Sequence, residues 1–480
     1  MRVIPDALIG YKIKDALIDC GGSVSRSDGG LDLPLPAIVT DSREVDAGDV
    51  FIALKGENFD GHNFIPAAIS RGAAYVICGR GRAIDGDAAF IEVDDTLRAL
   101  GDVSRGYLQK LSPPIVAAVT GSVGKTTTKE YLSSLLSVRY KTHKTGGNFN
   151  NLIGLPLTVL SAPADTEAIV LEMGMSARGE IDRLAEIARP NLAIITSIGT
   201  SHIEHLGSRE NICLAKCELL AHLREGAKVY LPANEPLLDR VKSDRYETIR
   251  VSTRPSNVGR IHAENIKTVG EQTVADIVGD ECYISLVFPT LGEHCLADAL
   301  LTVEAVRDLG YRESEIREGL LGYRPAGMRQ LIREVEGIKL IEDCYNASPE
   351  SMRASLDVLA SIETKDGARR AALLGDMYEL GECSTELHFA VGAYAAGVCD
   401  LLFTLGRGAV AIAEGAASAG MPRDRITVFD DISLYSECGA AMADRLSDGD
   451  VVLVKASRAT AAERATAAFE KEIKTNTNKG

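Results

Sequence analysis

The sequence predicts an α/β protein built around parallel sheets. An apolar run, Ile115 to Val119, ends at a glycine turn and leads into a segment with helical spacing, in which Tyr131 pairs with Leu135 and Leu132 with Leu136. Further apolar segments then alternate with helical patterns, and the alternation starts again after Tyr323. Strands that alternate with helices indicate parallel sheets covered by helices on both faces.

Three units follow from these patterns, within the two to four domains that 480 residues suggest. The first, residues 1–112, is rich in turns and short apolar runs such as DVFIALKG. Pro113 and Pro114 begin the second, residues 113–326. Pro325 and Gly327 interrupt the regular pattern before the third, residues 327–480. We therefore expect an N-terminal, a central and a C-terminal domain.

Composition limits the partners of the chain. Its 52 basic and 68 acidic residues give a formal charge of -16, which argues against a nucleic-acid partner or an anionic membrane surface. No uncharged apolar stretch reaches the roughly 18 residues of a membrane span, and Asp6 and Lys12 interrupt the N-terminal segment. The ten cysteines are scattered, as reduced thiols are. We expect a cytoplasmic protein without membrane insertion.

The glycine turn, TGSVGKTTTKE, predicts a phosphate site. Gly121 and Gly124 allow the backbone amides to close around an anion, Lys125 adds a positive charge, and the Thr126 hydroxyl is placed to hold Mg²⁺. The full P-loop pattern would have glycine where this chain has Val119, but the strand-to-helix context favours nucleotide binding over an ordinary turn. The expected nucleotide-binding residues are Thr120, Gly121, Ser122, Val123, Gly124, Lys125, Thr126 and Thr127.

Polar residues follow the next two apolar segments. Glu172 lies near the end of AIVLEMG, where ligands of open α/β sheets gather, and we assign it a magnesium role. His202 and His205 follow the end of NLAIITSIG, and Lys216 lies on a helix predicted from about Glu210 to Arg224. From the residues alone, Lys216 is interpreted as a solvated helix lysine.

Two further patterns leave alternatives open. His202 and His205 with Cys213 and Cys217 roughly match zinc-ligand pairs, but the short gap and the predicted helix favour two thiols on one buried helical face. In the first unit, TDSREV and KGENFDGHNF could hold an anionic or nucleotide-like ligand, although turn residues are the simpler interpretation. The residues concerned are Arg43, Lys55 and His62.

Several stretches together resemble the Mur ligase family, and most closely its members that add D-alanyl-D-alanine. They are TGSVGKTTTKE, TGGNFNNLIGLP, EMGMSARGEI, TSIGTSHIEHLGSRENICLAKCEL, DCYNASPESM, LGDMYELG and GDVVLVKASR. The resemblance extends from TDSREV to KASR and so covers nearly the whole chain.

The resemblance implies the fold and the reaction. It implies an N-terminal domain for the UDP end of the substrate, a central P-loop ATPase-like domain and a C-terminal Rossmann-like domain. With Mg²⁺ as cofactor, ATP would phosphorylate the terminal carboxylate of UDP-MurNAc-tripeptide. The amine of D-alanyl-D-alanine would then attack the acyl phosphate, giving UDP-MurNAc-pentapeptide for peptidoglycan synthesis, ADP and phosphate. We expect the chain to act as a monomer.

The resemblance also assigns roles to residues. Lys125 would compensate phosphate charge, Thr126 and Glu172 would hold one Mg²⁺, and His202 with a carbamylated Lys216 would hold a second. Arg329 and Asp343 match positions that reach ATP from the C-terminal side, which implies that this domain closes onto the central one. The implied substrate-binding residues are Asp41, Ser42, Arg43, Lys55, Asn148, Asn150, Asn151, Lys455 and Arg458.

The chain departs from the family pattern at a few positions. GEHCLADAL has Cys295 and Asp298 where the family has asparagines, and Asp298 would replace an amide near adenine. Ser348 stands in NASP where NANP is common, and Ala456 in KASR where KGSR is common. These changes concern adenine contacts and the C-terminal substrate site, and they leave the phosphate and metal residues unchanged.

Other readings of the chain remain open. A sister Mur ligase that adds an amino acid at an earlier step, or a related ligase such as folylpolyglutamate synthase or cyanophycin synthetase, would share the nucleotide motifs. The forms EMG, YNA and LGDMYELG favour the D-alanyl-D-alanine type. A nucleotide-sensing or scaffolding paralogue that has lost ligation is a different class, and the presence of Lys125, Glu172 and Lys216 argues against it.

Overall fold

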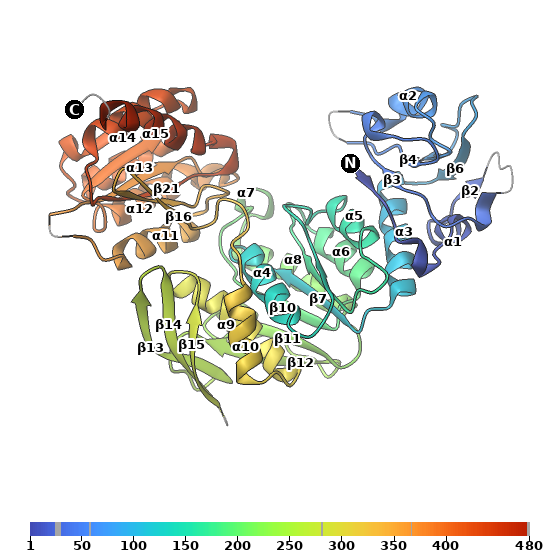
Figure 1. The fold of residues 1–480 in the computed structure, drawn as a ribbon, viewed down its shortest axis with the longest axis horizontal. Coiled ribbons are helices and arrows are strands. Elements are labelled where there is room, and N and C mark those ends of the chain that lie inside the picture. The colour runs from blue at the N-terminus through green and yellow to red at the C-terminus, as the bar shows by residue number, and fades with distance from the viewer. Residues whose placement is uncertain (25–29, 57–58, 280–281, 366, 478–480) are drawn as a thin grey trace.

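The computed structural model describes residues 1–24, 30–56, 59–279, 282–365 and 367–477. Each of three units in chain order contains its own sheet, and the N-terminal and C-terminal units lie on opposite sides of the central one (Figure 1). None of the helices within these ranges has the length and hydrophobicity that a membrane span requires.

The N-terminal unit contains a six-stranded sheet in the order β1-β3-β4-β5-β6-β2. Its inner strands β3 to β6 are parallel, and the short edge strands β1 and β2 are antiparallel to their neighbours. The strands are β1 (Arg2–Val3), β2 (Ser23–Val24), β3 (Ile38–Val39), β4 (Val50–Ile52), β5 (Tyr75–Gly79) and β6 (Ala89–Val93), and the helices are α1 (Ile13–Asp19), α2 (Ile65–Ser70) and α3 (Thr96–Leu111).

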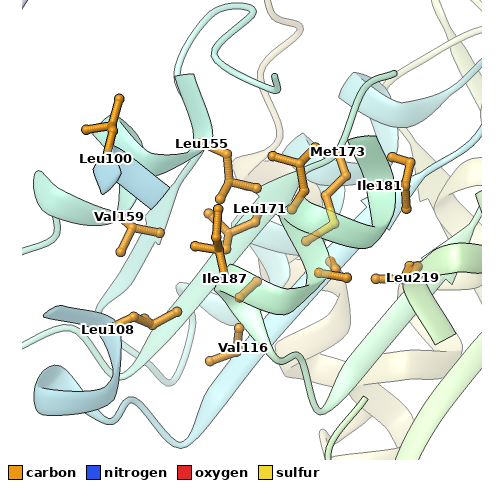
Figure 2. Close-up of a cluster of buried hydrophobic side chains, with 14 of the residues drawn as sticks. Leu100, Leu108, Val116, Leu155, Val159, Leu171, Met173, Ile181, Ile187 and Leu219 are labelled. Atoms are coloured by element: carbon orange, nitrogen blue, oxygen red, sulfur yellow. The ribbon is translucent and has the colours of Figure 1, made fainter. Parts of the chain in front are cut away.

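Helix α3 connects the N-terminal unit to the central one. Its start is capped by the Asp95 carboxylate, which accepts from the amides of Leu97 and Arg98. Its apolar face packs against helices α5 (Gly154–Leu160) and α6 (Glu180–Ala188). Leu100 and Leu108 therefore belong to one continuous core with residues of the central sheet (Figure 2). Each such side chain contributes about 1.5–3 kcal/mol when fully buried, so this helix fixes the two units together.

The central unit contains a nine-stranded sheet in the order β15-β14-β13-β12-β11-β10-β7-β9-β8. The strands from β8 to β13 in this order are parallel, as the sequence predicts, although β8, β12 and β13 were not among the predicted segments. Strands β14 and β15 extend the sheet as antiparallel strands and were not predicted either. The strands are β7 (Ile115–Thr120), β8 (Thr142–Lys144), β9 (Ala168–Glu172), β10 (Leu192–Ile195), β11 (Ala227–Pro232), β12 (Tyr246–Ser252), β13 (Ile261–Val269), β14 (Gln272–Gly279) and β15 (Cys282–Phe288).

Both faces of this sheet are covered by helices. Val116 and Ala118 of β7 belong to the core under α5 and α6, while Ala117 and Val119 belong to the core under α4 (Lys125–Leu136) and α9 (Glu293–Asp308). The continuous apolar run of β7 follows from this double burial. The remaining helices of the unit are α7 (Ile203–Leu206), α8 (Arg209–Cys217) and α10 (Glu313–Gly322).

The helix predicted from about Glu210 to Arg224 is shorter in the structure. It begins at Arg209, ends at Cys217 and continues as a 3-10 turn from Glu218 to His222. The Glu218 carboxylate accepts hydrogen bonds from the amides of Gly179 and Asp182 at the start of α6. This tertiary contact fixes the point at which the α-helical geometry ends.

The C-terminal unit contains a six-stranded sheet in the order β16-β17-β21-β18-β19-β20, which is parallel except for edge strand β16. The four predicted strands form its centre, and edge strands β16 and β20 are additional. The elements are β16 (Leu331–Val335), β17 (Ile338–Glu342), β18 (Arg370–Gly375), β19 (Leu401–Leu405), β20 (Ile426–Phe429), β21 (Val451–Lys455), α11 (Pro349–Ser361), α12 (Ser384–Ala395), α13 (Ala409–Ser418), α14 (Tyr435–Arg445) and α15 (Glu463–Thr477).

Candidate active site

A pocket lies where the central and C-terminal units meet. The central unit contributes the turn after β7 and the starts of α4 and α9, and the C-terminal unit contributes the ends of β17 and β21 and the start of α11. Most of the nucleotide-binding residues expected from the sequence are on its wall. The lining residues include Ser122, Val123, Gly124, Lys125, Thr126, Thr127, Ser201, His294, Cys295, Asp298, Tyr323, Arg329, Gln330, Asp343, Asn346, Ser348, Ser355 and Lys455.

The turn after β7 has the geometry of a phosphate loop. Gly121 has φ 151° and Gly124 has φ 89°, in the region that favours glycine. A Cβ atom at Gly121 would lie 1.9 Å from Oγ1 of Thr196, and one at Gly124 would lie 2.3 Å from Oδ1 of Asp298. Neither position can therefore accept a side chain. Amides at the start of a helix such as α4 point out of the helix end, which is where anions bind.

Lys125 folds back onto the loop that carries it. Its Nζ donates to the carbonyl oxygens of Gly121 at 2.7 Å and Ser122 at 3.2 Å. Burial lowers the pKa of this ammonium, and the nearby carboxylate of Glu172 partly opposes the shift. A phosphate bound in the loop would favour the charged form further, because it would bring a negative charge next to the ammonium.

Glu172 is the last residue of β9 and is 2% exposed. Its Oε2 accepts from the Thr126 hydroxyl at 2.9 Å, and its Oε1 accepts from Nδ2 of Asn150 at 2.8 Å. The structure thus brings together a hydroxyl and a carboxylate at the mouth of the phosphate loop. These hard oxygen donors fit Mg²⁺, which prefers one or two carboxylates beside phosphate oxygens.

Lys129 is a site residue that sequence reasoning missed. It is fully buried, and its Nζ lies 2.8 Å from the carbonyl oxygen of Thr145, 3.0 Å from Oε1 of Glu130 and 3.8 Å from Oε2 of Glu172. Its position four residues after Lys125 was the available signal, because residues at this spacing share one face of a helix. The buried ammonium is matched by carboxylates on two sides.

His202 and Lys216 belong to the segment that follows β10. The His202 backbone is left-handed, with φ 66°, and a carboxylate oxygen of Glu379 from the C-terminal unit lies against its Nδ1. Lys216 is 1% exposed, so the interpretation as a solvated lysine is wrong. Its pKa is far below the usual range, first because of burial and second because of the charge on Lys125. Within the described ranges its amine has no hydrogen-bond or ion-pair partner.

The cysteines of the zinc-like pattern lie together on α8. Sγ of Cys213 is 3.9 Å from Sγ of Cys217, and it also lies 3.4 Å from the carbonyl oxygen of Leu237. His205 is exposed on α7, and the Nδ1 of His202 is occupied by Glu379. This arrangement fits two thiols on one helical face.

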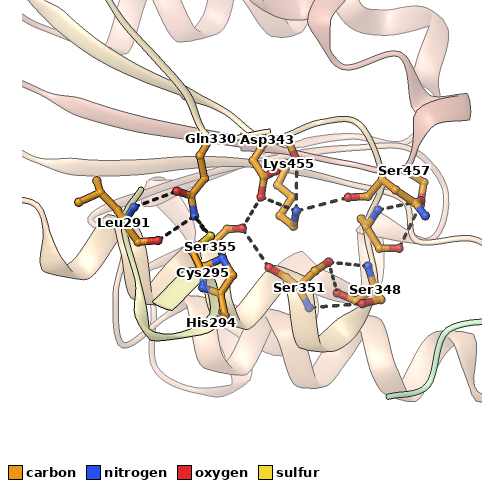
Figure 3. Close-up of polar contacts among 12 residues, drawn as sticks. Leu291, His294, Cys295, Gln330, Asp343, Ser348, Ser351, Ser355, Lys455 and Ser457 are labelled. Atoms are coloured by element: carbon orange, nitrogen blue, oxygen red, sulfur yellow. Dashed lines mark hydrogen bonds and ion pairs between the residues drawn. The ribbon is translucent and has the colours of Figure 1, made fainter. Parts of the chain in front are cut away.

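The C-terminal wall of the pocket is organised around Asp343 (Figure 3). Its Oδ2 accepts from Nζ of Lys455 at 2.7 Å and from the Ser355 hydroxyl at 2.6 Å. Burial acts to raise the pKa of this carboxyl, but Lys455 outweighs it, so the pKa is lowered. Arg329 lies 4.3 Å above the ring of Tyr345, which keeps its guanidinium on the pocket wall.

A neutral polar wall lies beside these charges. The Gln330 side chain donates to the Leu291 carbonyl oxygen at 3.0 Å and accepts from the Leu291 amide at 3.2 Å (Figure 3). Its amide nitrogen also lies 3.1 Å from Nε2 of His294, whose pKa burial lowers to about 4. His294 is therefore neutral near pH 7. Sequence reasoning missed both residues; His294 lies within the stretch GEHCLADAL, and Gln330 follows Arg329 directly.

Three family models match successive parts of the chain. The Mur ligase family catalytic domain matches residues 35–120, the Mur ligase middle domain residues 119–306, and the Mur ligase glutamate ligase domain residues 329–458. UDP-N-acetylmuramoyl-tripeptide--D-alanyl-D-alanine ligase of Bacillus subtilis is 39% identical over 88% of this chain and 90% of its own length. The chain belongs to the Mur ligase family. The resemblance found in the sequence motifs is confirmed.

Solved structures support the same fold. MurF from Acinetobacter baumannii superposes with a TM-score of 0.86 at 29% identity, covering 96% of this chain and 99% of that one. MurF ligase from Thermotoga maritima in complex with ADP gives a TM-score of 0.82 at 30% identity, covering 92% and 98%. The predicted three-domain α/β Mur ligase architecture is confirmed.

Several residues that the Mur ligase resemblance implies lie away from the pocket wall. Asn151 accepts from the amide of Gly154, the first residue of α5, at 2.8 Å, Asn148 is exposed, and Arg458 pairs with Glu463 on the surface. Of the three asparagines, Asn150 is the one whose side chain contacts Glu172.

The predicted UDP-end residues lie in the N-terminal domain of this Mur ligase. Asp41 and Lys55 follow β3 and β4, two neighbouring parallel strands, so they share the carboxyl edge of that sheet. Arg43 is exposed and pairs with Asp41 at 2.6 Å, while Ser42 is buried.

The departures from the Mur ligase pattern have different structural effects. Asp298 is 6% exposed, and burial raises the pKa of its carboxyl to about 8. The carboxyl therefore carries a proton near pH 7 and can donate a hydrogen bond, as the asparagine amide expected at this position would. Ser348 caps α11 by accepting from the Ser351 amide, a role that asparagine also fills. Ala456 is buried against Gly375: a Cβ added to Gly375 would lie 2.6 Å from the methyl group of Ala456.

Proposed function

We propose that this Mur ligase joins D-alanyl-D-alanine to UDP-MurNAc-tripeptide, with conversion of ATP to ADP and phosphate, to supply UDP-MurNAc-pentapeptide for peptidoglycan synthesis. The observation that carries the proposal is the pocket between the two units, in which the phosphate loop faces Arg329 and Asp343. The high coverage of relatives named for this reaction supports the choice of substrates.

The reaction must bring two anions together. A carboxylate that attacks the γ-phosphate approaches to about 3–3.5 Å, and one pair of like charges at about 4 Å costs roughly 4 kcal/mol at an effective dielectric near 20. Cations near the reacting groups are therefore required. Lys125 and Arg329 both line the pocket and can supply this compensation from the central and C-terminal sides.

Two metal positions are proposed, the first from the donor groups at Glu172 and the second from the Mur ligase resemblance. Thr126 and Glu172 would hold one Mg²⁺, with Asn150 and Lys129 orienting the carboxylate. Bound Mg²⁺ would neutralise phosphate charge during transfer. His202 and a carbamylated Lys216 would hold the second. The low pKa and the lack of a partner within the described ranges favour a neutral Lys216 amine, which is the form that adds carbon dioxide.

In the proposed order of steps, the loop amides and Lys125 would hold the phosphates of ATP while the tripeptide carboxylate attacks the γ-phosphorus. A new P–O bond forms, the bond to the β-phosphate oxygen breaks, and ADP leaves. The dipeptide amine then attacks the acyl carbonyl, a C–N bond forms, and phosphate leaves as the amine loses a proton. Arg329 and Asp343 would reach ATP from the C-terminal domain, and Lys455 would hold Asp343 in place. The N-terminal residues Asp41, Ser42, Arg43 and Lys55 would bind the UDP end, and we expect a monomer acting in the cytoplasm, where these nucleotides are made.

A reconstituted assay tests the proposal. The purified chain is incubated with ATP, Mg²⁺ and UDP-MurNAc-tripeptide, with either D-alanyl-D-alanine or single amino acids, and phosphate release and product mass are measured. We expect product when D-alanyl-D-alanine is supplied and no product when single amino acids are supplied in its place. Product with a single amino acid would instead indicate a sister ligase. Normal ATP binding without a trappable acyl phosphate would indicate a nucleotide-binding paralogue.

A further inference from the structure

A loop of the C-terminal unit rests on helix α7 of the central unit. This loop, residues 376–381, follows β18, and a carboxylate oxygen of its Glu379 lies against Nδ1 of His202. The amide of Glu204 donates to the carbonyl oxygen of Glu379 at 3.3 Å. A Cβ added to Gly381 would lie 3.3 Å from Cα of Glu204, so the two backbones are close. Side chain and backbone both contribute to this contact.

Both residues of the side-chain contact have unusual backbone conformations. His202 has φ 66° and Glu379 has φ 63°, in the left-handed region that costs a non-glycine residue on the order of 1 kcal/mol or more. Such conformations persist where the surrounding structure requires them. Here they face each other across the boundary between two units, which indicates that the contact depends on both backbones being held in place.

The contact engages one of the two ring nitrogens of His202. With Glu379 at Nδ1, the nitrogen left for a ligand is Nε2. A carboxylate on the far nitrogen of a metal-binding histidine fixes the ring orientation and raises its basicity as a ligand.

A second acidic residue of the C-terminal unit holds the same segment. Oε1 of Glu350, near the start of α11, accepts from the amide of Thr200 at 2.8 Å. The segment from Thr200 to His202 is therefore contacted by two carboxylates of the C-terminal unit, Glu350 at Thr200 and Glu379 at His202. A movement of that unit would release both.

We propose that Glu379 is a positioning residue that makes metal binding by His202 depend on docking of the C-terminal domain. The inference rests on the proposed function, which assigns a metal to His202. It adds Glu379, which is not one of the proposed metal-binding residues. Because the domain that is expected to bind the amine substrate also carries Glu379, docking and completion of the second metal site become one event.

The test uses the full chain with Glu379→Ala, Glu379→Gln and a matched control. Glu382→Gln is the control, because Glu382 is an exposed acid only three positions further along the chain. The measurements are the Mg²⁺ concentration for half-maximal phosphate release, the KM for ATP, and hydrogen exchange of the amides of residues 203–206 in protein without nucleotide.

For Glu379→Ala we expect the half-maximal Mg²⁺ concentration to rise about 10-fold or more, the usual effect of losing such a partner, with little change in the KM for ATP. Exchange of the 203–206 amides should also become faster. Glu379→Gln should show a smaller metal effect, because its amide oxygen can still lie against Nδ1 of His202. Glu382→Gln should behave as the parent in every measurement.

Parental Mg²⁺ dependence and parental exchange in Glu379→Ala would overturn the inference. Equal effects in Glu379→Ala and Glu382→Gln would overturn it as well, because they would reflect charge on the surface and not the contact. If the parent protein does not ligate at all, the proposed function fails. Hydrogen exchange would then still decide whether Glu379 holds α7.

Discussion

The hydroxyl of Thr126 lies 2.9 Å from Oε2 of Glu172, although the two residues are 46 positions apart in the sequence. Thr126 is the second residue of α4 and Glu172 is the last of β9. Strand β9 pairs in parallel with β7, the strand before the phosphate loop. The contact therefore follows from sheet pairing, because the carboxyl ends of neighbouring parallel strands meet at one edge.

Replacing Lys125 with alanine should abolish pentapeptide formation, a loss of at least about 10²–10³-fold in kcat, because one preorganised charge is removed from the phosphate site. The rate of phosphate release measures the loss in kcat. Lys141→Ala is the control, since Lys141 is an exposed lysine that pairs with Asp165 on the surface. A Lys125→Ala variant that turned over at the parental rate would refute the proposed phosphate site.

Replacing Lys129 with methionine should destabilise the fold by about 3–5 kcal/mol, because the buried carboxylates of Glu130 and Glu172 would lose their shared cation. Urea unfolding at pH 7 measures the change. In the double variant with Glu130→Gln the loss should be similar, because Glu130 keeps Lys144 as a partner and the carboxylate left without its cation is that of Glu172. A parental unfolding midpoint in Lys129→Met would show that this buried network contributes nothing to stability.

Replacing Asp298 with asparagine should change how stability depends on pH. The pKa of this carboxyl is about 8 in the folded chain, against 3.8 for an unperturbed aspartate, which is the value expected in the unfolded chain. Between pH 3.8 and about pH 8 the folded state therefore holds a proton that the unfolded state has lost. The free energy of unfolding of the parent therefore falls as pH rises through this window. The Asp298→Asn variant lacks this term, so its stability relative to the parent should increase from pH 5 to pH 8.

Urea unfolding of both proteins at several pH values measures the difference. Equal pH dependence in parent and variant would show that Asp298 does not titrate in this window. Asp298→Glu is a further control, because it keeps the ionisable group while changing its length.

Replacing Gly124 with alanine should abolish nucleotide binding and destabilise the fold by about 1–3 kcal/mol, because the new methyl group would collide with Asp298 at a left-handed φ. Gly81→Ala is the matched control: it also has a positive φ, 70°, but a Cβ there has no neighbour within 4 Å. ATP binding by calorimetry and thermal unfolding measure the two effects. Equal losses of ATP binding and stability in both variants would show that the positive φ, and not the collision with Asp298, causes the effect.

Local patterns predicted the elements that carry the phosphate site. The apolar run before Thr120 and the helical spacing after Lys125 indicated a strand, a loop and a helix, and the structure has β7 and α4 at these positions. The same reasoning did not detect β14 and β15. Their half-exposed alternation is a weaker signal than a continuously buried strand.

The sequence by itself determined the buried strand before the phosphate loop, the glycine loop and the family motifs, because these depend on neighbours within a few residues. Only the tertiary structure decided that Lys216 is buried, that Lys129 shares Glu172 with Thr126, and that Glu379 reaches His202. Each of these facts joins segments that are distant in the chain. Burial and charge pairing at such points are set by sheet pairing and by the contact between the two units, which no local pattern contains.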